Sequence, residues 1–289
     1  MAWFRKAAWA AAAALIAGAA QAAPAMWRVS NGASKVYLFG TLHALKPETQ
    51  WRTPLYNQVL QQAGTVWFEA DMESGDPDSI RLLIQRYGSD PDTPLSRKLP
   101  ATDVAALARQ TDLARIDHLR PWAVALMLSM QPALARGART EKGADLTITH
   151  AARSDAKRVR TFETLEDQAR MFAGLPQVSE VQYLTSVIHE RSGAARPGKP
   201  QLAKAPTLEA NWLAGKLGVA EIADMKADNA SLYEAFLKNR NLAWANALTT
   251  EMAASSGVEL VNVGALHMIG ADGLPALMAA RGFKVERVQ

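Results

Sequence analysis

The chain has 289 residues, carries 32 Lys and Arg side chains against 28 Asp and Glu, and is 49% apolar. That is enough sequence and apolar surface for one large domain or two small ones with a buried core. The sequence contains no cysteine, which excludes disulfides, thiolate zinc sites, thiol redox pairs and a cysteine nucleophile.

The first 22 residues have the pattern of a secretory signal peptide. Arg5 and Lys6 precede an apolar run over 7–19, and residues 20–22 (Ala-Gln-Ala) form a small-x-small cleavage site. A membrane anchor is the alternative, but the run is weakly apolar and shorter than the roughly 20 residues of a span. Cleavage leaves 30 basic against 28 acidic side chains, which argues against nucleic acid as a partner. We therefore expect a periplasmic or secreted protein with no stable membrane anchor, in which residues 23–289 form a single domain.

Apolar runs predict strands at both ends of the mature chain. Residues 26–29 and 36–39 form a hairpin around an Asn31-Gly32 turn. Further strands are predicted over 65–70, 158–162, 258–263 and 283–288. Most of the rest has helical spacing, and the last helix is expected to start at a capping Asp272 and to end at Arg281-Gly282. The prediction is an α+β (mixed α/β) fold, with a central sheet built from the N- and C-terminal segments and a largely helical middle region.

Two of the five histidines share one local pattern. His43 and His267 each follow an apolar strand, a glycine and two further residues. A glycine at a strand end lets the chain bend or approach a ligand closely, and open α/β sheets usually bind ligands at their carboxyl edge. Imidazole is a common ligand of zinc, cobalt and manganese, so the two side chains could converge on one ion. Alternatively, each histidine only forms hydrogen bonds within its own loop.

Glu69 and Asp71 follow the apolar strand segment Val66-Trp67-Phe68. An unpaired buried carboxylate is costly, and both acids would share one face if the strand continued. One carboxylate and two histidines would give three protein ligands and one open position, as a metal hydrolase needs. The structural alternative is that Glu69 pairs with an arginine.

Arg240 lies between Phe236 and Trp244 at helical spacing, on an apolar stripe. Its guanidinium could hold a carboxylate ligand or stabilise an anionic transition state. It could also extend over its neighbours to solvent. Asn241 stands beside it and could take part.

Together these residues resemble the TraB/GumN family, which is related to the Tiki metalloproteases and, more distantly, to erythromycin esterase-like hydrolases. The resemblance rests on the two glycine-x-x-histidine motifs and the strand glutamate between them. It also rests on four short segments in the family's order: 119–122 (Leu-Arg-Pro-Trp), 143–145 (Gly-Ala-Asp), 162–168 (Phe-Glu-Thr-Leu-Glu-Asp-Gln) and 240–241 (Arg-Asn). It covers almost the whole mature chain, and Phe162 departs from it where an aliphatic residue is usual.

The resemblance implies a divalent metal ion (manganese, cobalt or zinc) held by His43, His267 and Glu69, with Arg240 and Glu163 in support. Tiki-type members are metal-dependent peptidases, so the expected function is an exported metal-dependent hydrolase acting on a peptide or small-molecule substrate. Asp71 or the activated water itself would be the base. The sequence has no His-Glu-x-x-His helix and no Gly-x-Ser-x-Gly elbow. The alternative is a non-catalytic protein that binds or sequesters a peptide or small molecule, including haem, in the same cleft.

Overall fold

The computed structural model of the chain describes residues 22–71, 77–192 and 207–289. The predicted signal peptide therefore lies outside the described residues, apart from Ala22. In these described ranges, no helix is long and apolar enough to cross a membrane.

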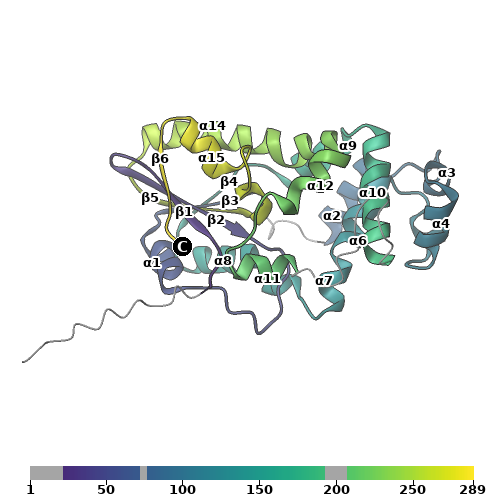
Figure 1. Cartoon of the computed structure of the whole chain (residues 1–289), viewed down its shortest axis with the longest axis horizontal. Helices are drawn as coiled ribbons and strands as arrows, with labels where there is room; N and C mark the ends of the chain where they lie inside the picture. The colour runs from purple at the N-terminus through teal and green to yellow at the C-terminus, as the bar shows by residue number, and fades with distance from the viewer. Residues whose placement is uncertain (1–21, 72–76, 193–206) are drawn as a thin grey trace, which may run out of the picture.

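Six strands form one mixed sheet in the order β4-β3-β5-β2-β1-β6, and the helices surround it (Figure 1). The strands are β1 (Met26–Asn31), β2 (Ser34–Thr41), β3 (Thr65–Phe68), β4 (Arg158–Thr161), β5 (Gly257–Gly264) and β6 (Lys284–Arg287). Strands β4, β3, β5 and β2 are parallel, whereas β1 is antiparallel to both β2 and β6. The predicted α+β class is confirmed, with a sheet built from both ends of the chain and a helical middle.

Two details of the predicted strands are wrong by one or two residues. The hairpin turn is Gly32-Ala33, because Asn31 still pairs with Ser34, and Gly32 has a φ of 58° that glycine adopts without steric cost. Strand β3 ends at Phe68, so Glu69 and Ala70 lie beyond it. The chain can turn immediately after β3, which matters for the position of Asp71.

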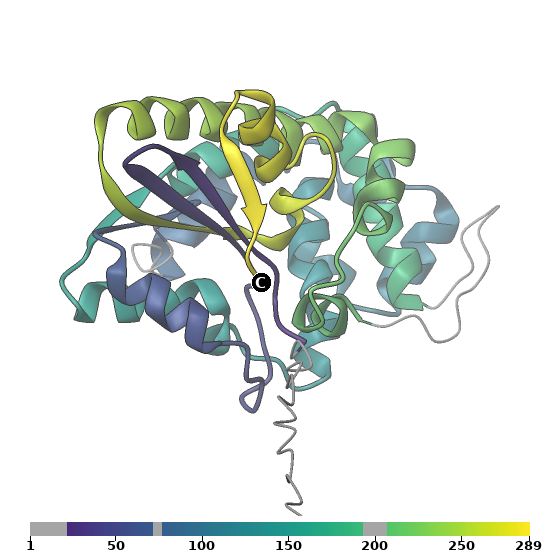
Figure 2. The ribbon, with the colours of Figure 1, turned by 60° about the vertical axis from the view of Figure 1, so that its left-hand side comes forward.

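Each face of the sheet is covered by helices that present an apolar stripe to it. On one face, α1 (Pro54–Gln62) and α8 (Ala144–Ser154) pack against β2, β3 and β5, and Trp212 of α11 (Leu208–Leu213) joins this core. On the other face, α14 (Asn239–Ala254) and α15 (Leu274–Ala280) contribute Trp244, Leu248 and Met278 to a second core. Figure 2 shows the sheet between these two layers.

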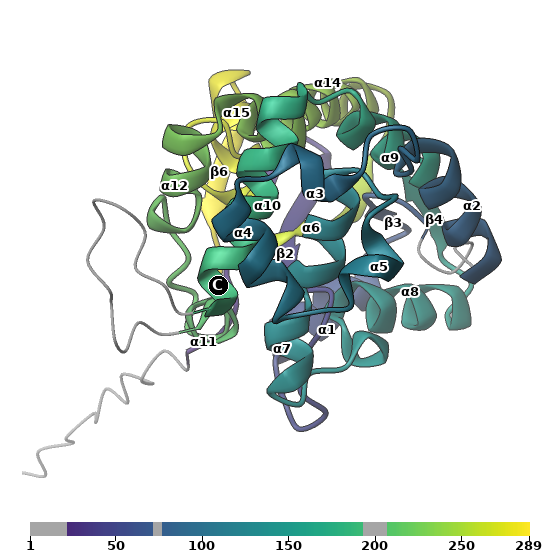
Figure 3. The ribbon, with the colours of Figure 1, turned by 90° about the vertical axis from the view of Figure 1, so that its right-hand side faces the viewer.

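The helical middle of the chain packs beyond the carboxyl edge of the parallel strands, in front of the sheet in Figure 3. Its main core joins α6 and α10 through Leu128, Leu184 and Ile188. The helices of this region are α2 (Pro77–Tyr87), α3 (Leu95–Lys98), α4 (Ala101–Ala108), α5 (Leu113–Ile116), α6 (Pro121–Ser129), α7 (Gln131–Ala135), α9 (Leu165–Ala173), α10 (Gln177–Ser192), α12 (Ala220–Asp228) and α13 (Ala230–Tyr233).

The predicted capping role of Asp272 is wrong. The N-cap residue of α15 is Gly273, whereas the Asp272 carboxylate accepts a hydrogen bond from the Tyr233 hydroxyl at 2.7 Å and pairs with Lys226 at 3.4 Å. The Asp272 side chain therefore makes tertiary contacts with Tyr233 and Lys226 and does not cap α15. The predicted end of the helix is confirmed, because Arg281 is its C-cap residue.

Candidate functional site

The four parallel strands each deliver one of the predicted residues to the same edge of the sheet. Glu163 follows β4, Glu69 follows β3, His267 follows β5 and His43 follows β2. Parallel strands place their carboxyl ends together, so residues far apart in the chain meet there. The structure thus brings together one acid from each of β4 and β3 and one histidine from each of β5 and β2.

Glu69 is held by partners from three other segments. Its Oε1 accepts the backbone N–H of Gly264 at 2.5 Å, and its Oε2 accepts from Arg240 Nη2 at 2.7 Å and Gln168 Nε2 at 3.4 Å. Burial opposes ionisation of this carboxyl, but the positive charges of Arg240 and His43 and the hydrogen bond from the Gly264 N–H hold the pKa of Glu69 well below its ordinary value. The carboxylate is therefore ionised at neutral pH.

The glycine of the second motif is explained by this contact. A Cβ on Gly264 would lie 3.0 Å from Oε1 of Glu69, so a side chain there would push the carboxylate away from the backbone N–H. The glycine of the first motif has a different reason. A Cβ on Gly40 would lie 2.7 Å from the Cα of Ala265, at the start of the 3-10 helix η3 (Ala265–Met268).

His267 lies in η3 and its side chain is 2% exposed. Its Nδ1 is 2.6 Å from Oδ1 of Asn241. Because Nδ2 of Asn241 donates to the Asp272 carbonyl at 2.7 Å, the amide oxygen faces the ring and Nδ1 carries the proton. Nε2 is then the acceptor, 3.2 Å from Arg240 Nη1 and 3.5 Å from Glu69 Oε1. Burial and the nearby positive charge lower the pKa of His267 to about 3, so the ring is neutral.

Arg240 joins the two acids to this histidine. Nε donates to Glu163, Nη2 to Glu163 and Glu69, and Nη1 to His267 and the Phe236 carbonyl. These bonds use all the N–H donors that a guanidinium has. The group also lies 4.6 Å from the ring centre of Trp244. Of the predicted alternatives, the structure favours the one in which Arg240 holds carboxylates.

A π-helical segment, η2 (Glu234–Lys238), makes one of these bonds possible. The N–H of Asn239 bonds to the Glu234 carbonyl five residues back, and this wider turn interrupts the α-helical ladder between α13 and α14. Within it, the Phe236 carbonyl accepts Nη1 of Arg240 at 3.0 Å.

Glu163 anchors the outer side of the arginine. Besides Arg240, it accepts from Trp244 Nε1 at 3.0 Å and Gln168 Nε2 at 3.5 Å. The sequence interpretation did not assign Gln168 and Trp244 to the site. Both could have been found, because Trp244 continues the stripe of Arg240 and Gln168 ends the 162–168 segment that carries part of the family resemblance.

His43 lies at the outer end of the cluster, with 51% of its side chain exposed. Its Nδ1 is 2.8 Å from Asp145 Oδ2, in the first turn of α8. Gly143 permits this approach, because a Cβ there would overlap the His43 carbonyl. Desolvation opposes protonation, but the Asp145 carboxylate raises the pKa of His43 to about 9. The sequence interpretation did not assign Asp145 to the site.

Asp71 does not share the face of Glu69 that a longer strand would give it. Because β3 ends at Phe68, the chain turns, and Asp71 pairs with Arg153 of α8 at 2.8 Å. This ion pair lies on the α8 side of the sheet, whereas Glu69 pairs with Arg240 of α14 on the other side.

The donor set at this edge matches a divalent ion in its chemistry. His267 offers an unprotonated Nε2 beside Glu69 Oε1, His43 offers its other ring nitrogen, and nitrogen and oxygen donors suit manganese, cobalt and zinc. Among the described residues, no group of three or more His, Asp and Glu side chains is placed to hold a metal ion. In this arrangement the Arg240 guanidinium contacts both Nε2 and Glu69, where a cation would bind.

The comparisons with known proteins agree with this motif set. The sequence pattern of the TraB/PrgY/gumN family matches residues 25–287. The chain is 26% identical over 212 residues to a protein called "uncharacterized protein YbaP" from Escherichia coli (strain K12), covering 68% of this chain and 76% of that protein. The Shigella flexneri protein of the same name shows the same identity and coverage. No solved structure matches. The chain therefore belongs to the TraB/PrgY/gumN family.

Proposed function

We propose that this chain is an exported hydrolase that uses a divalent metal ion, manganese, cobalt or zinc, to cleave peptides. His43, His267 and Glu69 would hold the ion, and export rests on the signal-peptide pattern of residues 1–22. When bound, such an ion would supply a Lewis acid that polarises the scissile carbonyl and lowers the pKa of water.

The observation that carries the proposal is how the two histidines are held. In each, Nδ1 is bound to a side-chain oxygen from a helix outside the motif, Asp145 of α8 or Asn241 of α14. Metal-binding histidines nearly always have one ring nitrogen held by such an acceptor, which leaves the other free for the ion. The two histidines follow neighbouring parallel strands, and each has its Nδ1 held by an acceptor. Together with an ionised Glu69, this arrangement supports a metal site.

The remaining side chains would position this site. Because all donors of Arg240 are in use, it holds Glu69 and His267 in place and does not contact a substrate oxygen. Glu163 and Gln168 would fix Arg240 and Glu69 in turn. Asp71 would have to leave Arg153 to act as a base, so its part in the proposal rests on its place in the sequence alone.

Alanine variants of the two histidines test the proposal. His43→Ala and His267→Ala should each abolish bound metal, measured by elemental analysis, and cleavage of a peptide library supplied with manganese, cobalt or zinc. His189→Ala is the matched control, because His189 also pairs with an aspartate, Asp103, at 3.0 Å but lies in the helical region. Unchanged metal stoichiometry in both site variants would refute the proposed metal site.

A second function is favoured by the position of Arg240. The guanidinium satisfies His267 and Glu69 without a metal, so the same cleft could serve a non-catalytic protein that sequesters a peptide or small molecule. Peptide binding that survives a chelator, with intact peptide by mass spectrometry, would support this function. A Soret band on titration with haem would identify haem as the ligand.

A further inference from the structure

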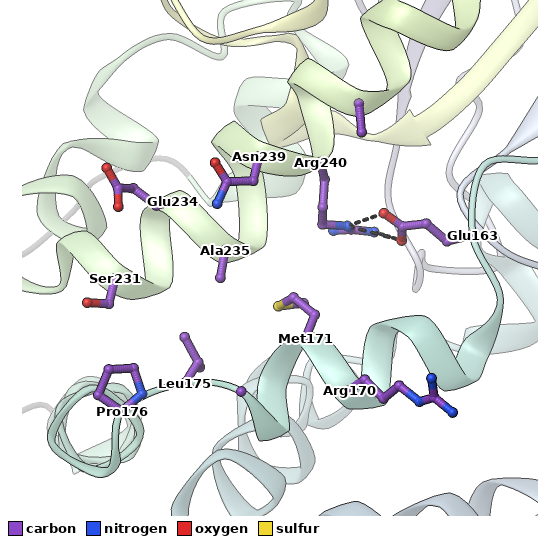
Figure 4. Close-up of a pocket in the computed structure, with 12 residues that line it drawn as sticks. Glu163, Arg170, Met171, Leu175, Pro176, Ser231, Glu234, Ala235, Asn239 and Arg240 are labelled. Carbon is purple, nitrogen blue, oxygen red and sulfur yellow. Dashed lines mark hydrogen bonds and ion pairs between the residues drawn. The ribbon is translucent and has the colours of Figure 1, made fainter.

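A groove of about 500 Å³ opens beside the Arg240–Glu163 ion pair. It lies between the C-terminal end of α9 with the α9–α10 connection and the helix that runs from α13 through η2 into α14. Figure 4 shows Arg240 and Glu163 at one end of the space and Ser231 and Pro176 at the other. A ligand lying along the groove would therefore reach the positioning network of the site.

Apolar residues form part of both walls of the groove, and polar or charged residues form the rest. Met171, Leu175 and Pro176 line one wall, and Ala235 and Ala243 line the other. In Figure 4, Met171 and Leu175 rise from below toward Ala235. Small alanines facing longer side chains leave room for an apolar group, and the volume is in the range of small-ligand sites.

The charges around the groove are balanced and already paired. Arg240 pairs with Glu163 at 2.9 Å, Arg170 with Glu166 at 2.8 Å, and Glu234 with Lys238 at 3.4 Å. A charged ligand would have to compete with these partners for the charged residues of the lining. The lining therefore favours an uncharged occupant.

The π-helical segment links this groove to the site. Its residues Glu234 and Ala235, and Asn239 after it, line the groove, and its Phe236 carbonyl holds Arg240. π-Helical turns are rare and often occur at functional sites. The same local widening of the helix thus builds one groove wall and positions the arginine that holds Glu69.

We propose that this groove is the subsite that binds an uncharged, apolar segment of a peptide substrate, next to the cluster at the sheet edge. The identification of the occupant as substrate rests on the proposed function. The binding itself does not require metal, so it can be tested separately from cleavage.

The test is binding of blocked dipeptides in the presence of a chelator. Acetyl-Leu-Leu-amide should bind the mature protein at least about tenfold more tightly than acetyl-Asp-Asp-amide or acetyl-Lys-Lys-amide in ligand-observed NMR titrations. Ala243→Trp would fill the groove and should weaken the leucine peptide at least about tenfold. Ala247→Trp is the matched control, because Ala247 is also exposed and lies one turn further along α14. Ala243→Leu, a smaller change, should weaken binding in the same direction.

The outcomes separate the two proposals. Selective binding that is lost in Ala243→Trp and kept in Ala247→Trp supports the subsite, even if no peptide is cleaved with any metal, a result that would refute only the hydrolase. Undetectable binding, equal binding of charged and apolar peptides, or equal effects of the two tryptophan variants would overturn the subsite and leave the metal tests unaffected.

Discussion

His267 donates its Nδ1 proton to the amide oxygen of Asn241 across 2.6 Å. His43, which stands at the same position of the same motif, faces a carboxylate instead, Asp145 at 2.8 Å. A neutral amide in a buried site leaves the imidazole neutral, whereas a carboxylate favours the imidazolium. Two copies of one sequence pattern thus give one neutral histidine and one positively charged histidine.

The first prediction concerns this difference. In metal-free protein at pH 7, long-range ¹H–¹⁵N spectra should show His267 as the neutral Nδ1–H form and His43 as doubly protonated. Asn241→Asp should raise the pKa of His267, because a carboxylate would then accept its proton. Asn246→Asp, on the exposed side of α14, is the control and should leave the His267 signals unchanged. An Nε2–H form of His267 in the unmodified protein would contradict the assignment.

The second prediction is the pH dependence of stability. The pKa of His267 is about 3 in the folded protein and 6.5 when unperturbed, so between these values the unfolded state binds the extra proton. The stability contributed by a neutral His267 is therefore present above pH 6.5 and is lost as the pH falls toward 3. For His43 the pKa is raised to about 9, so its contribution is present below pH 6.5 and is lost as the pH rises through 9.

Urea unfolding from pH 5 to pH 10 would measure both effects. The free energy of unfolding should fall on both sides of a maximum near neutral pH. His267→Asn should reduce the acidic slope and His43→Asn the alkaline slope, with His118→Asn as a control away from the site. Parallel profiles for all four proteins would contradict the two protonation states.

The third prediction concerns the Arg240 network. Arg240→Lys keeps the charge but replaces a planar group of five donors by a single ammonium, so Glu69, Glu163 and the Phe236 carbonyl cannot all be satisfied. Buried acceptors left without partners should lower the free energy of unfolding by about 2–4 kcal/mol. Arg281→Lys, which changes a less buried arginine bonded to Asn246, should cost under about 1 kcal/mol. Equal losses in the two variants would show that the network does not stabilise the fold.

Much of this arrangement could be predicted because it depends on local pattern. Apolar runs predicted all six strands of the sheet, and the tendency of open α/β sheets to bind ligands at their carboxyl edge indicated that His43 and His267 could meet there. That Glu69 would join them was implied by the family resemblance. The stripe around Arg240 left both a carboxylate-bound and a solvent-exposed guanidinium open, and Arg240 is 7% exposed. The metal that these residues were expected to hold stays a prediction.

The remainder depends on contacts between distant segments. Asp71 does not lie on the face of Glu69, because it pairs with Arg153, 82 residues later in the chain. The apolar run that suggested a longer strand carries no information about this distant partner. Local spacing predicted Asp272 as a helix cap, but its carboxylate binds Tyr233 and Lys226 instead. The acceptors of the two histidines, Asp145 and Asn241, likewise come from helices outside both motifs.

The last prediction concerns the glycines of the two motifs. A Cβ on Gly40 would meet backbone, the Cα of Ala265 at 2.7 Å, whereas a Cβ on Gly264 would meet the Glu69 carboxylate at 3.0 Å. Backbone cannot yield without moving η3, but a carboxylate can shift by a few tenths of an ångström. Gly40→Ala should therefore lower the free energy of unfolding by about 1–3 kcal/mol, and Gly264→Ala by less.

Gly64→Ala is the matched control, because a Cβ there has open space around it, and its unfolding free energy should stay within about 0.5 kcal/mol of the unmodified protein. The Gly264 variant should show its effect in the site instead. Displacing Glu69 from the Gly264 N–H removes a bond that favours the carboxylate, so the pKa of Glu69, followed by ¹³C NMR, should rise in Gly264→Ala and stay unchanged in Gly64→Ala. An unchanged Glu69 pKa in Gly264→Ala would show that Gly264 is not needed to make room for the Glu69 carboxylate. Equal stability of Gly40→Ala and Gly64→Ala would show that Gly40 is not needed to make room for the Ala265 backbone.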